Sequence, residues 1–197
     1  MGKVTAGFSM SLDGFVADSK DGVDEVFKWY VTGNADADVR TGDTTFKMTA
    51  EGADYIEAAG RGAGVLVSAR RTFDIANAWG GKHPMNVPVV VVTHKVPKEW
   101  ADRSDSPFTF VTDGIESAIK KAKEIAGEKD VVVGAPSVTQ QCLALGLLDE
   151  IHIDLAPVVL VDGVRLFDHL GTGPIELELT ESSGTPHVTH LTYRVVK

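Results

Sequence analysis

The chain contains a single cysteine, Cys142, among its 197 residues. One cysteine excludes an intrachain disulfide, and scarce cysteine is typical of proteins that work in a reducing compartment. Because Cys142 lies within a helical pattern, we expect a buried and unreactive side chain. The first residues, Met1–Val4, lead directly into a strand pattern, so we expect no signal peptide. These features together predict a cytoplasmic protein.

Basic residues are also scarce, since 19 lysines and arginines stand against 28 aspartates and glutamates, a net charge of −9. Proteins that bind nucleic acid or anionic membranes need a basic stripe, which this sequence lacks, so we expect neither partner. A transmembrane helix needs about 20 consecutive apolar residues, and no run approaches that length. A small molecule remains as the expected partner. A local cluster of cations is enough to bind one phosphorylated ligand.

Segments with strand and helix patterns alternate along most of the chain. The length and the hydrophobic fraction of 43% suffice for one core, so we expect a single domain, 1–197. The expected elements are strands at 4–10, 64–67, 87–93, 108–111, 131–133 and 150–160, helices at 23–30, 49–59, 70–78, 115–126 and 137–146, a loop with a short hairpin at 32–45, and closing strands at 175–181 and 188–196. This order predicts an α/β fold with a mostly parallel, helix-covered sheet and a C-terminal antiparallel hairpin.

One junction between a strand and a helix suits an anionic ligand. The apolar run Val131–Val133 ends at Gly134, and Pro136 suits the first position of the following helix. At such a junction, backbone N–H groups and the positive end of the helix face one point, which favours a phosphate. A glycine required only for packing explains the same pattern equally well.

Two other motifs are typical of binding sites, but their context argues against a dinucleotide site and a metal site. The glycine-rich segment Gly60–Gly64 precedes a strand, whereas a dinucleotide fingerprint lies between a strand and a helix, so we interpret it as a loop. His187 and His190 are three residues apart, a spacing that sends two strand residues to opposite faces. With no carboxylate positioned to complete a ligand set, we expect no metal site.

Cations follow two of the expected strands. Arg70 and Arg71 open a helix directly after the strand at 64–67, and Thr93 and Lys95 follow the next strand. Arginine is unfavourable at the positive end of a helix, so two arginines there indicate a bound anion. Because ligands of α/β sheets bind at the carboxyl ends of the strands, these residues and Gly134 predict one anion site.

Four motifs carry a resemblance to a known family. They are Ser11–Ala17 (SLDGFVA), Arg70–Phe73 (RRTF), Gly134–Ala135 (GA), and the long segment Gly146–Phe167. The chain resembles the dihydrofolate reductase superfamily, and most of all the reductase domain at the C-terminus of bifunctional riboflavin-biosynthesis deaminase-reductases and its stand-alone bacterial relatives. The resemblance spans nearly the whole chain, and the deaminase zinc motif is missing, so it indicates the reductase half alone.

The resemblance implies a three-layer fold with a mixed sheet of about eight strands, NADPH as cofactor and a homodimer. It also implies the cofactor contacts. Those for the adenosine phosphates are Arg70, Arg71 and Thr72, those near the 2′-phosphate are Thr93 and Lys95, those for the pyrophosphate and nicotinamide ribose are Gly134, Ala135, Ser137, Val138 and Thr139, and those of the loop over the nicotinamide are Ser11 and Gly14. The chain departs from the family pattern at Ala69, Val133 and Val161, where the family has glycine.

We therefore expect a reductase that transfers a hydride from NADPH to a pyrimidine- or pterin-like substrate, at a C–N or sugar-imine bond. Such a reaction needs an acid near the substrate, and Asp13 and Asp24 are the candidates that follow the first strand. A true dihydrofolate reductase remains an alternative, which requires Asp24 or Glu25 inside a pocket helix. A cofactor-binding relative without turnover is the other alternative, because Val133 adds bulk near the nicotinamide path.

Overall fold

The computed structural model describes residues 2–33, 38–41, 44–101, 103, 106–168, 170–171 and 173–197. Their strands are β1 (Val4–Ser11), β2 (Phe15–Ala17), β3 (Asp38–Thr41), β4 (Thr44–Lys47), β5 (Ala63–Ala69), β6 (Val89–Val92), β7 (Phe108–Val111), β8 (Asp130–Val133), β9 (Glu150–Ala156), β10 (Val164–Arg165), β11 (Leu177–Thr185) and β12 (Val188–Val195). Their helices are α1 (Ala50–Gly62), α2 (Arg70–Ile75), α3 (Lys98–Ala101), α4 (Ile115–Ala126) and α5 (Pro136–Ala144), with 3-10 turns η1 (Lys28–Val31) and η2 (Asn77–Gly81).

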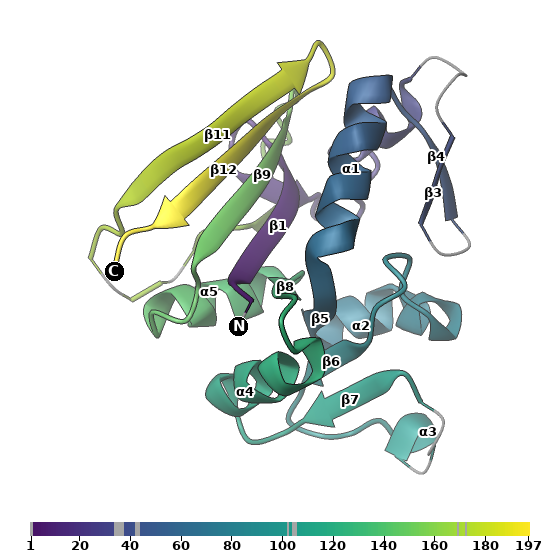
Figure 1. Ribbon diagram of the computed structural model, residues 1–197, viewed down its shortest axis with the longest axis vertical. Coiled ribbons are helices and arrows are strands. Elements are labelled where there is room, and N and C mark those ends of the chain that lie inside the picture. Colours follow the sequence, from purple (N-terminus) through teal and green to yellow (C-terminus); the bar gives the residue numbers. More distant parts are fainter. Residues whose placement is uncertain are drawn as a thin grey trace.

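Eight of these strands form one sheet in the order β11-β12-β9-β1-β8-β5-β6-β7 (Figure 1). Strand β1 lies between β8 and β9 and is parallel to both, and β5, β6 and β7 continue the parallel pairing. The hairpin of β11 and β12 adds the antiparallel edge against β9. The predicted α/β fold, with a mostly parallel sheet and a C-terminal hairpin, is confirmed.

The main core lies between the sheet and the helices α4 and α5. Apolar residues of β1, β5, β8 and β9 on one face pack against an inward stripe of α4 made of Ile115, Ala118, Ile119, Ala122 and Ala126. Fully burying one such aliphatic side chain stabilises the fold by about 1.5–3 kcal/mol. Cys142 of α5 lies in this core, and burial raises the pKa of its thiol to about 12, as expected for an unreactive cysteine.

Several predicted boundaries were wrong. The segment Gly60–Gly64 is not a loop, because α1 continues to Gly62 and β5 starts at Ala63 without a connection. The segment 23–30 forms turns and then η1 rather than an α-helix. Strand β11 continues to Thr185, beyond the predicted end of that strand at 181, so the turn of the hairpin is confined to residues 186–187. Within the described residues, no helix is long and apolar enough to cross a membrane.

The opposite face of the sheet is covered by two separate layers. Near β5, β6 and β7 it packs against Phe73 of α2 and Ala78 of η2. Near β12 it is covered by η1 and α1, with Trp29 and Met48 at the centre of a small apolar cluster. Figure 1 shows α1 running alongside β1, while β11 and β12 lie further out. Polar residues of the sheet, among them Asp154 and His190, also lie on this face beside α1.

Candidate active site

The carboxyl ends of β8, β5 and β6 lie side by side, since these strands are adjacent and parallel. The register pairs Ala69 with Val92, so the residues that follow β5 and β6 start at the same height. Arg70 reaches across this edge, and its Nη1 donates to the backbone oxygen of Lys95 at 3.1 Å. The structure thus brings the two predicted cation segments together.

The two arginines have carboxylate partners within the chain. Nε of Arg70 lies 2.8 Å from both carboxylate oxygens of Asp74, one helical turn away. Nη2 of Arg71 lies 2.8 Å from both carboxylate oxygens of Asp21. The expectation that these cations require a bound anion was therefore too strong. The side chain of Arg71 is still 74% exposed, so its ion pair with Asp21 lies at the surface.

The remaining residues of these strand ends have more local roles. The Thr93 hydroxyl donates to the backbone oxygen of Lys95 at 2.9 Å and accepts from its backbone N–H at 3.3 Å, which closes the turn after β6. Lys95 itself is exposed. Thr72 is half-buried in the first turn of α2, and its backbone oxygen accepts from the N–H of Ala76. One buried hydroxyl, that of Ser68, has no partner among the described residues.

The junction of β8 and α5 has the predicted geometry. The backbone N–H of Gly134 donates to Val67, Ala135 is fully buried, and Pro136 opens the helix. A Cβ at Gly134 would lie 2.8 Å from Cδ1 of Leu66, so packing is one reason for this glycine.

The first turn of α5 offers mainly backbone groups to a ligand. Val138 and Thr139 are buried, and the Thr139 hydroxyl donates to the backbone oxygen of Ala135 at 3.1 Å. The Ser137 side chain is exposed. Of the three side chains at this turn, only that of Ser137 is free to reach a bound phosphate.

The loop after β1 is fixed by Asp13. Its carboxylate accepts from the Ser11 hydroxyl at 2.6 Å and from the backbone N–H groups of Leu160 at 3.1 Å and Val161 at 2.8 Å. These hydrogen bonds, that from Ser11 first, lower the pKa of Asp13 to about 2. An acid that is ionised and fully bonded is a poor proton donor, so the geometry gives Asp13 a structural role.

Two other predicted residues follow β1. Gly14 has a φ of 90°, and its backbone oxygen accepts from the N–H of Leu166, which ties the loop to the segment after β10. Asp24 is exposed and lies in the turns before η1.

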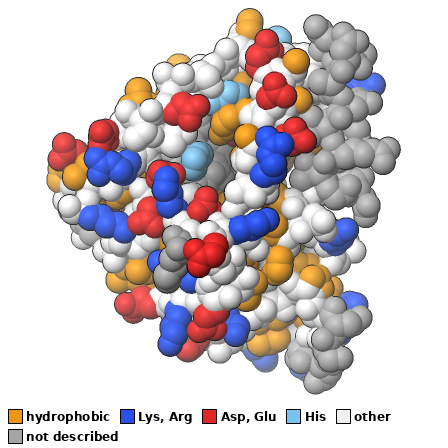
Figure 2. All heavy atoms as spheres, in the orientation of Figure 1, with side chains coloured by type: hydrophobic (Ala, Val, Ile, Leu, Met, Phe, Trp, Pro, Cys, Tyr) orange, Lys and Arg blue, Asp and Glu red, His pale blue; other side chains and the backbone are white. Residues whose placement is uncertain are grey.

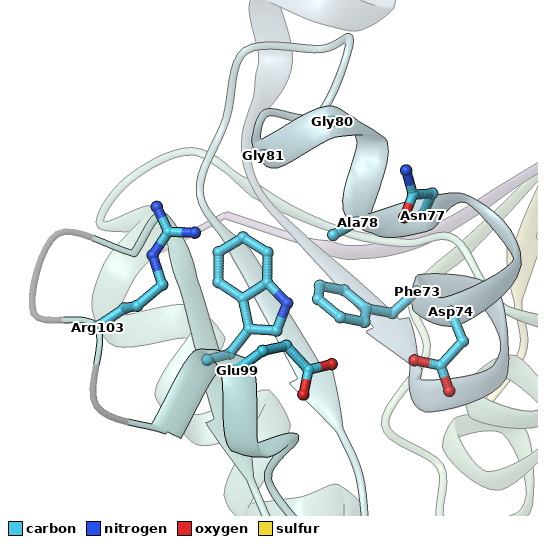
Figure 3. A pocket seen from close by; sticks show the side chains of 9 residues that line it. Phe73, Asp74, Asn77, Ala78, Gly80, Gly81, Glu99 and Arg103 are labelled. Carbon is cyan, nitrogen blue, oxygen red and sulfur yellow. The ribbon is translucent and has the colours of Figure 1, made fainter.

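A hollow of about 560 Å³ lies between α2, η2 and α3 (Figure 3). Its walls include Phe73, Trp100 and the Asp74 carboxylate that pairs with Arg70. The backbone of Asn77, Ala78 and Trp79 has φ between 47° and 51°, a left-handed conformation that costs roughly 1–2 kcal/mol per residue. None of the predicted site residues lines this hollow.

Sequence reasoning missed a cluster of polar residues on the face of the sheet beside α1. Asp154 of β9 and His190 of β12 are paired in register, and Oδ1 of Asp154 lies 2.7 Å from Nδ1 of His190. Ser9 of β1 is the next neighbour of Asp154, and its hydroxyl accepts from the indole N–H of Trp29 at 2.9 Å. Tyr55 of α1 stacks on the imidazole, with ring centroids 3.8 Å apart.

This cluster is buried and incompletely satisfied. Asp154 and His190 are only 8% and 6% exposed, and Nε2 of His190 has no partner among the described residues. Leaving such a group unpaired costs about 1–3 kcal/mol. Burial raises the pKa of Tyr30 and of Tyr55, and the charge of Asp154 adds to both shifts, so both hydroxyls stay protonated. The alternation of His152 and Asp154 with the apolar residues of β9 is a sequence signal that could have indicated a polar face, although it does not reveal the contact with His190.

A family model described as the RibD C-terminal domain matches residues 2–191. The chain belongs to the RibD C-terminal domain family. A search of curated proteins found no match. Among solved structures, the chain is similar to a putative riboflavin biosynthesis protein from Shewanella sp. PV-4, with 21% identity, 99% coverage of each chain and a TM-score of 0.74.

Two further solved structures, from a deaminase/reductase and a dihydrofolate reductase, are similar in fold to this chain. The chain is similar to a deaminase/reductase from Thermotoga maritima, with 12% identity and a TM-score of 0.63, covering 99% of this chain and 57% of that one. It is also similar to dihydrofolate reductase from Enterococcus faecalis, with 12% identity, a TM-score of 0.61 and coverage of 100% and 98%. These likenesses show a dihydrofolate-reductase-like fold, as the sequence motifs predicted.

Proposed function

We propose that this protein is an NADPH-dependent reductase of the riboflavin-biosynthesis type. The substrate class is a ring-opened ribosylamino-pyrimidine or a related polar heterocycle, which accepts a hydride at a C–N double bond. Family membership over residues 2–191 is the observation that carries this proposal. The deaminase/reductase from Thermotoga maritima is named for 5-amino-6-(5-phosphoribosylamino)uracil, which is therefore the first substrate to test.

The strand ends have the chemistry that a dinucleotide phosphate needs. Arg70 and Lys95 lie together at the edge of β5 and β6, and Arg71 is exposed beside them. The first turn of α5 adds backbone N–H groups and the positive end of a nine-residue helix. The unpaired hydroxyl of Ser68, one residue before the end of β5, supports the same edge as the cofactor site.

The chain's own contribution is to bind and orient the reactants. NADPH supplies the hydride when bound. Ser11, Gly14 and the rest of the loop after β1 would cover the nicotinamide, and Asp13 holds this loop against Leu160 and Val161. Positioning of this kind lowers the barrier by fixing the distance and angle between the reacting atoms.

The proposal also includes assembly and location. Strand β11 is an exposed edge of the sheet, and Leu177 and Leu179 on it are 38% and 52% exposed. Two exposed leucines on one face of an unpaired edge strand support a symmetric homodimer through the C-terminal hairpin. A cytoplasmic location agrees with a single buried thiol.

A panel of ligands tests the proposal, because a ligand that binds only the native state raises the melting temperature by mass action. The panel contains NADPH, NADH, FMN, dihydrofolate and 5-amino-6-(5-phosphoribosylamino)uracil. NADPH should give the largest shift of the nucleotides, and the pyrimidine should add to it. A shift with dihydrofolate instead of the pyrimidine would favour a dihydrofolate reductase, although Asp24 and Glu25 lie outside any helix. A shift with NADPH and no turnover would indicate a cofactor-binding relative.

A further inference from the structure

The face of the sheet beside α1 is polar over three neighbouring strands. Alternate residues of β1, β9 and β12 point into the main core, and the residues between them lie on the other face. Paired across the strands, this second set comprises Ser9, Asp154 and His190 in one row and Gly7, His152 and Thr192 in the next. Figure 2 shows histidine side chains among charged groups on the face in view, beside α1. A sheet face packed only for stability would carry apolar residues here.

The hydrogen bonds fix the orientation of the His190 imidazole. Nδ1 is engaged by Asp154 at 2.7 Å, so a proton on Nδ1 is held by the carboxylate. Nε2 on the opposite side of the ring is buried and has no partner among the described residues. A carboxylate that holds one imidazole nitrogen so that the other can exchange a proton is the arrangement found in general acid–base sites.

Gly7 provides the approach to this pair. It lies in the middle of the central strand β1 but is exposed, and a Cβ placed on it would meet nothing within 4 Å. Glycine within a strand marks a bulge, a bend or a place where a ligand or another backbone approaches closely, and the register of β1 with β9 shows no bulge at Gly7. Its register partner is His152, which precedes Asp154 by two residues. The open backbone and the unpaired nitrogen therefore lie on one face, one row apart.

We infer that this face is the substrate side of the active site, and that His190, oriented by Asp154, donates the proton that completes the reduction. The inference rests on the proposed function and adds the residues that handle the substrate. It replaces Asp13 and Asp24 as candidate acids with a pair whose geometry suits the task.

The step balances with the reaction proposed above. The carbon of the substrate C=N bond accepts the hydride from NADPH, and the π electron pair moves to the nitrogen. That nitrogen takes the proton from Nε2 of the imidazolium, which leaves a neutral imidazole, a reduced C–N bond and NADP⁺. Solvent returns the proton to His190. Asp154, at 2.7 Å from Nδ1, orients the ring and stabilises its cationic form.

Tyr55 covers the imidazole of His190. Its ring stacks on His190, with the ring centroids 3.8 Å apart. Tyr55 is only half-buried, so a substrate ring can displace it and take its place against the imidazole. This displacement gives the ligand access to Nε2, which is otherwise buried.

The test compares His190→Asn with His187→Asn. Asparagine at 190 retains a donor near the position of Nδ1, and hence the bond to Asp154, but lacks Nε2. The control places the same substitution on an exposed histidine of the hairpin turn. With NADPH and 5-amino-6-(5-phosphoribosylamino)uracil, His190→Asn should lower kcat about 100-fold or more, as expected for loss of a general acid. His187→Asn should retain the rate of the unsubstituted chain, and all three proteins should bind NADPH equally well.

Asp154 is a positioning residue in this account. Asp154→Asn should lower kcat with little change in KM, and Asp154→Glu should restore part of the rate. A merely structural role would lower the melting temperature and leave kcat unchanged. If His190→Asn does not fold, His190→Gln and Asp154→Asn carry the test.

A rate within about threefold of the unsubstituted chain for folded His190→Asn would overturn the inference. If the unsubstituted chain does not reduce the pyrimidine, calorimetric binding of the pyrimidine to the NADP⁺-loaded protein decides. At least tenfold weaker binding by His190→Asn upholds the assignment of this face to the substrate and leaves the proton transfer refuted, whereas equal binding, or none by either protein, overturns both. NADPH binding is measured separately, so failure of the cofactor assignment is distinguished from failure at His190.

Discussion

The residues at the carboxyl ends of β5 and β6 make the choice of cofactor testable. Arg71→Ala should weaken NADPH binding about tenfold or more and leave NADH binding nearly unchanged, because the exposed guanidinium is free to exchange Asp21 for the 2′-phosphate. Calorimetric titration of both nucleotides measures the two affinities. Arg61→Ala, which removes an exposed arginine of α1, is the matched control. Equal affinities for NADPH and NADH in the unsubstituted chain would refute the assignment.

Asp13 gives a prediction about stability and pH. Its folded-state pKa of about 2 is below the ordinary value of 3.8, so its ionised form stabilises the folded chain. This contribution is complete above the ordinary value and is lost as the pH falls through it toward the folded value. Asp13→Asn should therefore be less stable than the unsubstituted chain at pH 7, and the difference should narrow between pH 4 and pH 2. Urea denaturation at several pH values measures it, and a constant difference would contradict the role of the carboxylate.

At the residue scale, the sequence predicted the grouping of the residues at the strand ends but not the polar face beside α1. Arg70 and Lys95 follow strands, and the rule that ligands bind at strand ends was enough to place them together. The pairing of Arg71 with Asp21 joins residues 50 positions apart and has no local signal. Asp154 and His190 were missed for the same reason, because their contact depends on the register between β9 and β12.

The junction of β8 and α5 gives a prediction at the level of elements. Gly134→Val should abolish NADPH binding, because the side chain blocks close approach to the first turn of α5. It should also destabilise the fold by about 1–3 kcal/mol through overpacking, since its Cβ would meet the buried side chain of Leu66. Thermal unfolding and NADPH titration measure the two effects, and Gly134→Ala gives the smaller steric step. Unaltered NADPH binding by folded Gly134→Val would make Gly134 a packing residue alone.

A helix whose two ends are marked by glycine was predicted well. Helix α4 spans 115–126 as expected, because its apolar stripe repeats with the helical period and Gly114 and Gly127 bound it with positive φ. The direct passage from α1 into β5 was not predicted, because the glycines at 60, 62 and 64 favour a loop on local grounds. The pairing of β2 with β10 was also missed, since it joins short segments far apart in the sequence.

The position of β1 is the property of the whole molecule that sequence could not supply. The alternation of strands and helices predicts a parallel sheet but not that β1 lies between β8 and β9. That order sets Gly7 and Ser9 beside His152 and Asp154, and so creates the polar face. The polar face is thus created by the topology, not by any single motif.

Assembly through the C-terminal hairpin is a further prediction at this scale. The chain should be a dimer at tens of micromolar in analytical ultracentrifugation. Leu179→Lys should convert it to a monomer, because it places a charge on the exposed edge strand β11. Val159→Lys, at another exposed apolar position, should leave the dimer intact. A monomeric unsubstituted chain would show that the hairpin is not an interface.

The most direct test of the proposed reductase follows the hydride itself. NADPH carrying deuterium at the transferable C4 position is incubated with the protein and 5-amino-6-(5-phosphoribosylamino)uracil, and the pyrimidine product is analysed by mass spectrometry. The account predicts a product that contains one deuterium at the former sugar-imine carbon, formed together with NADP⁺. A protein that binds both compounds but leaves the deuterium on the nicotinamide would contradict it.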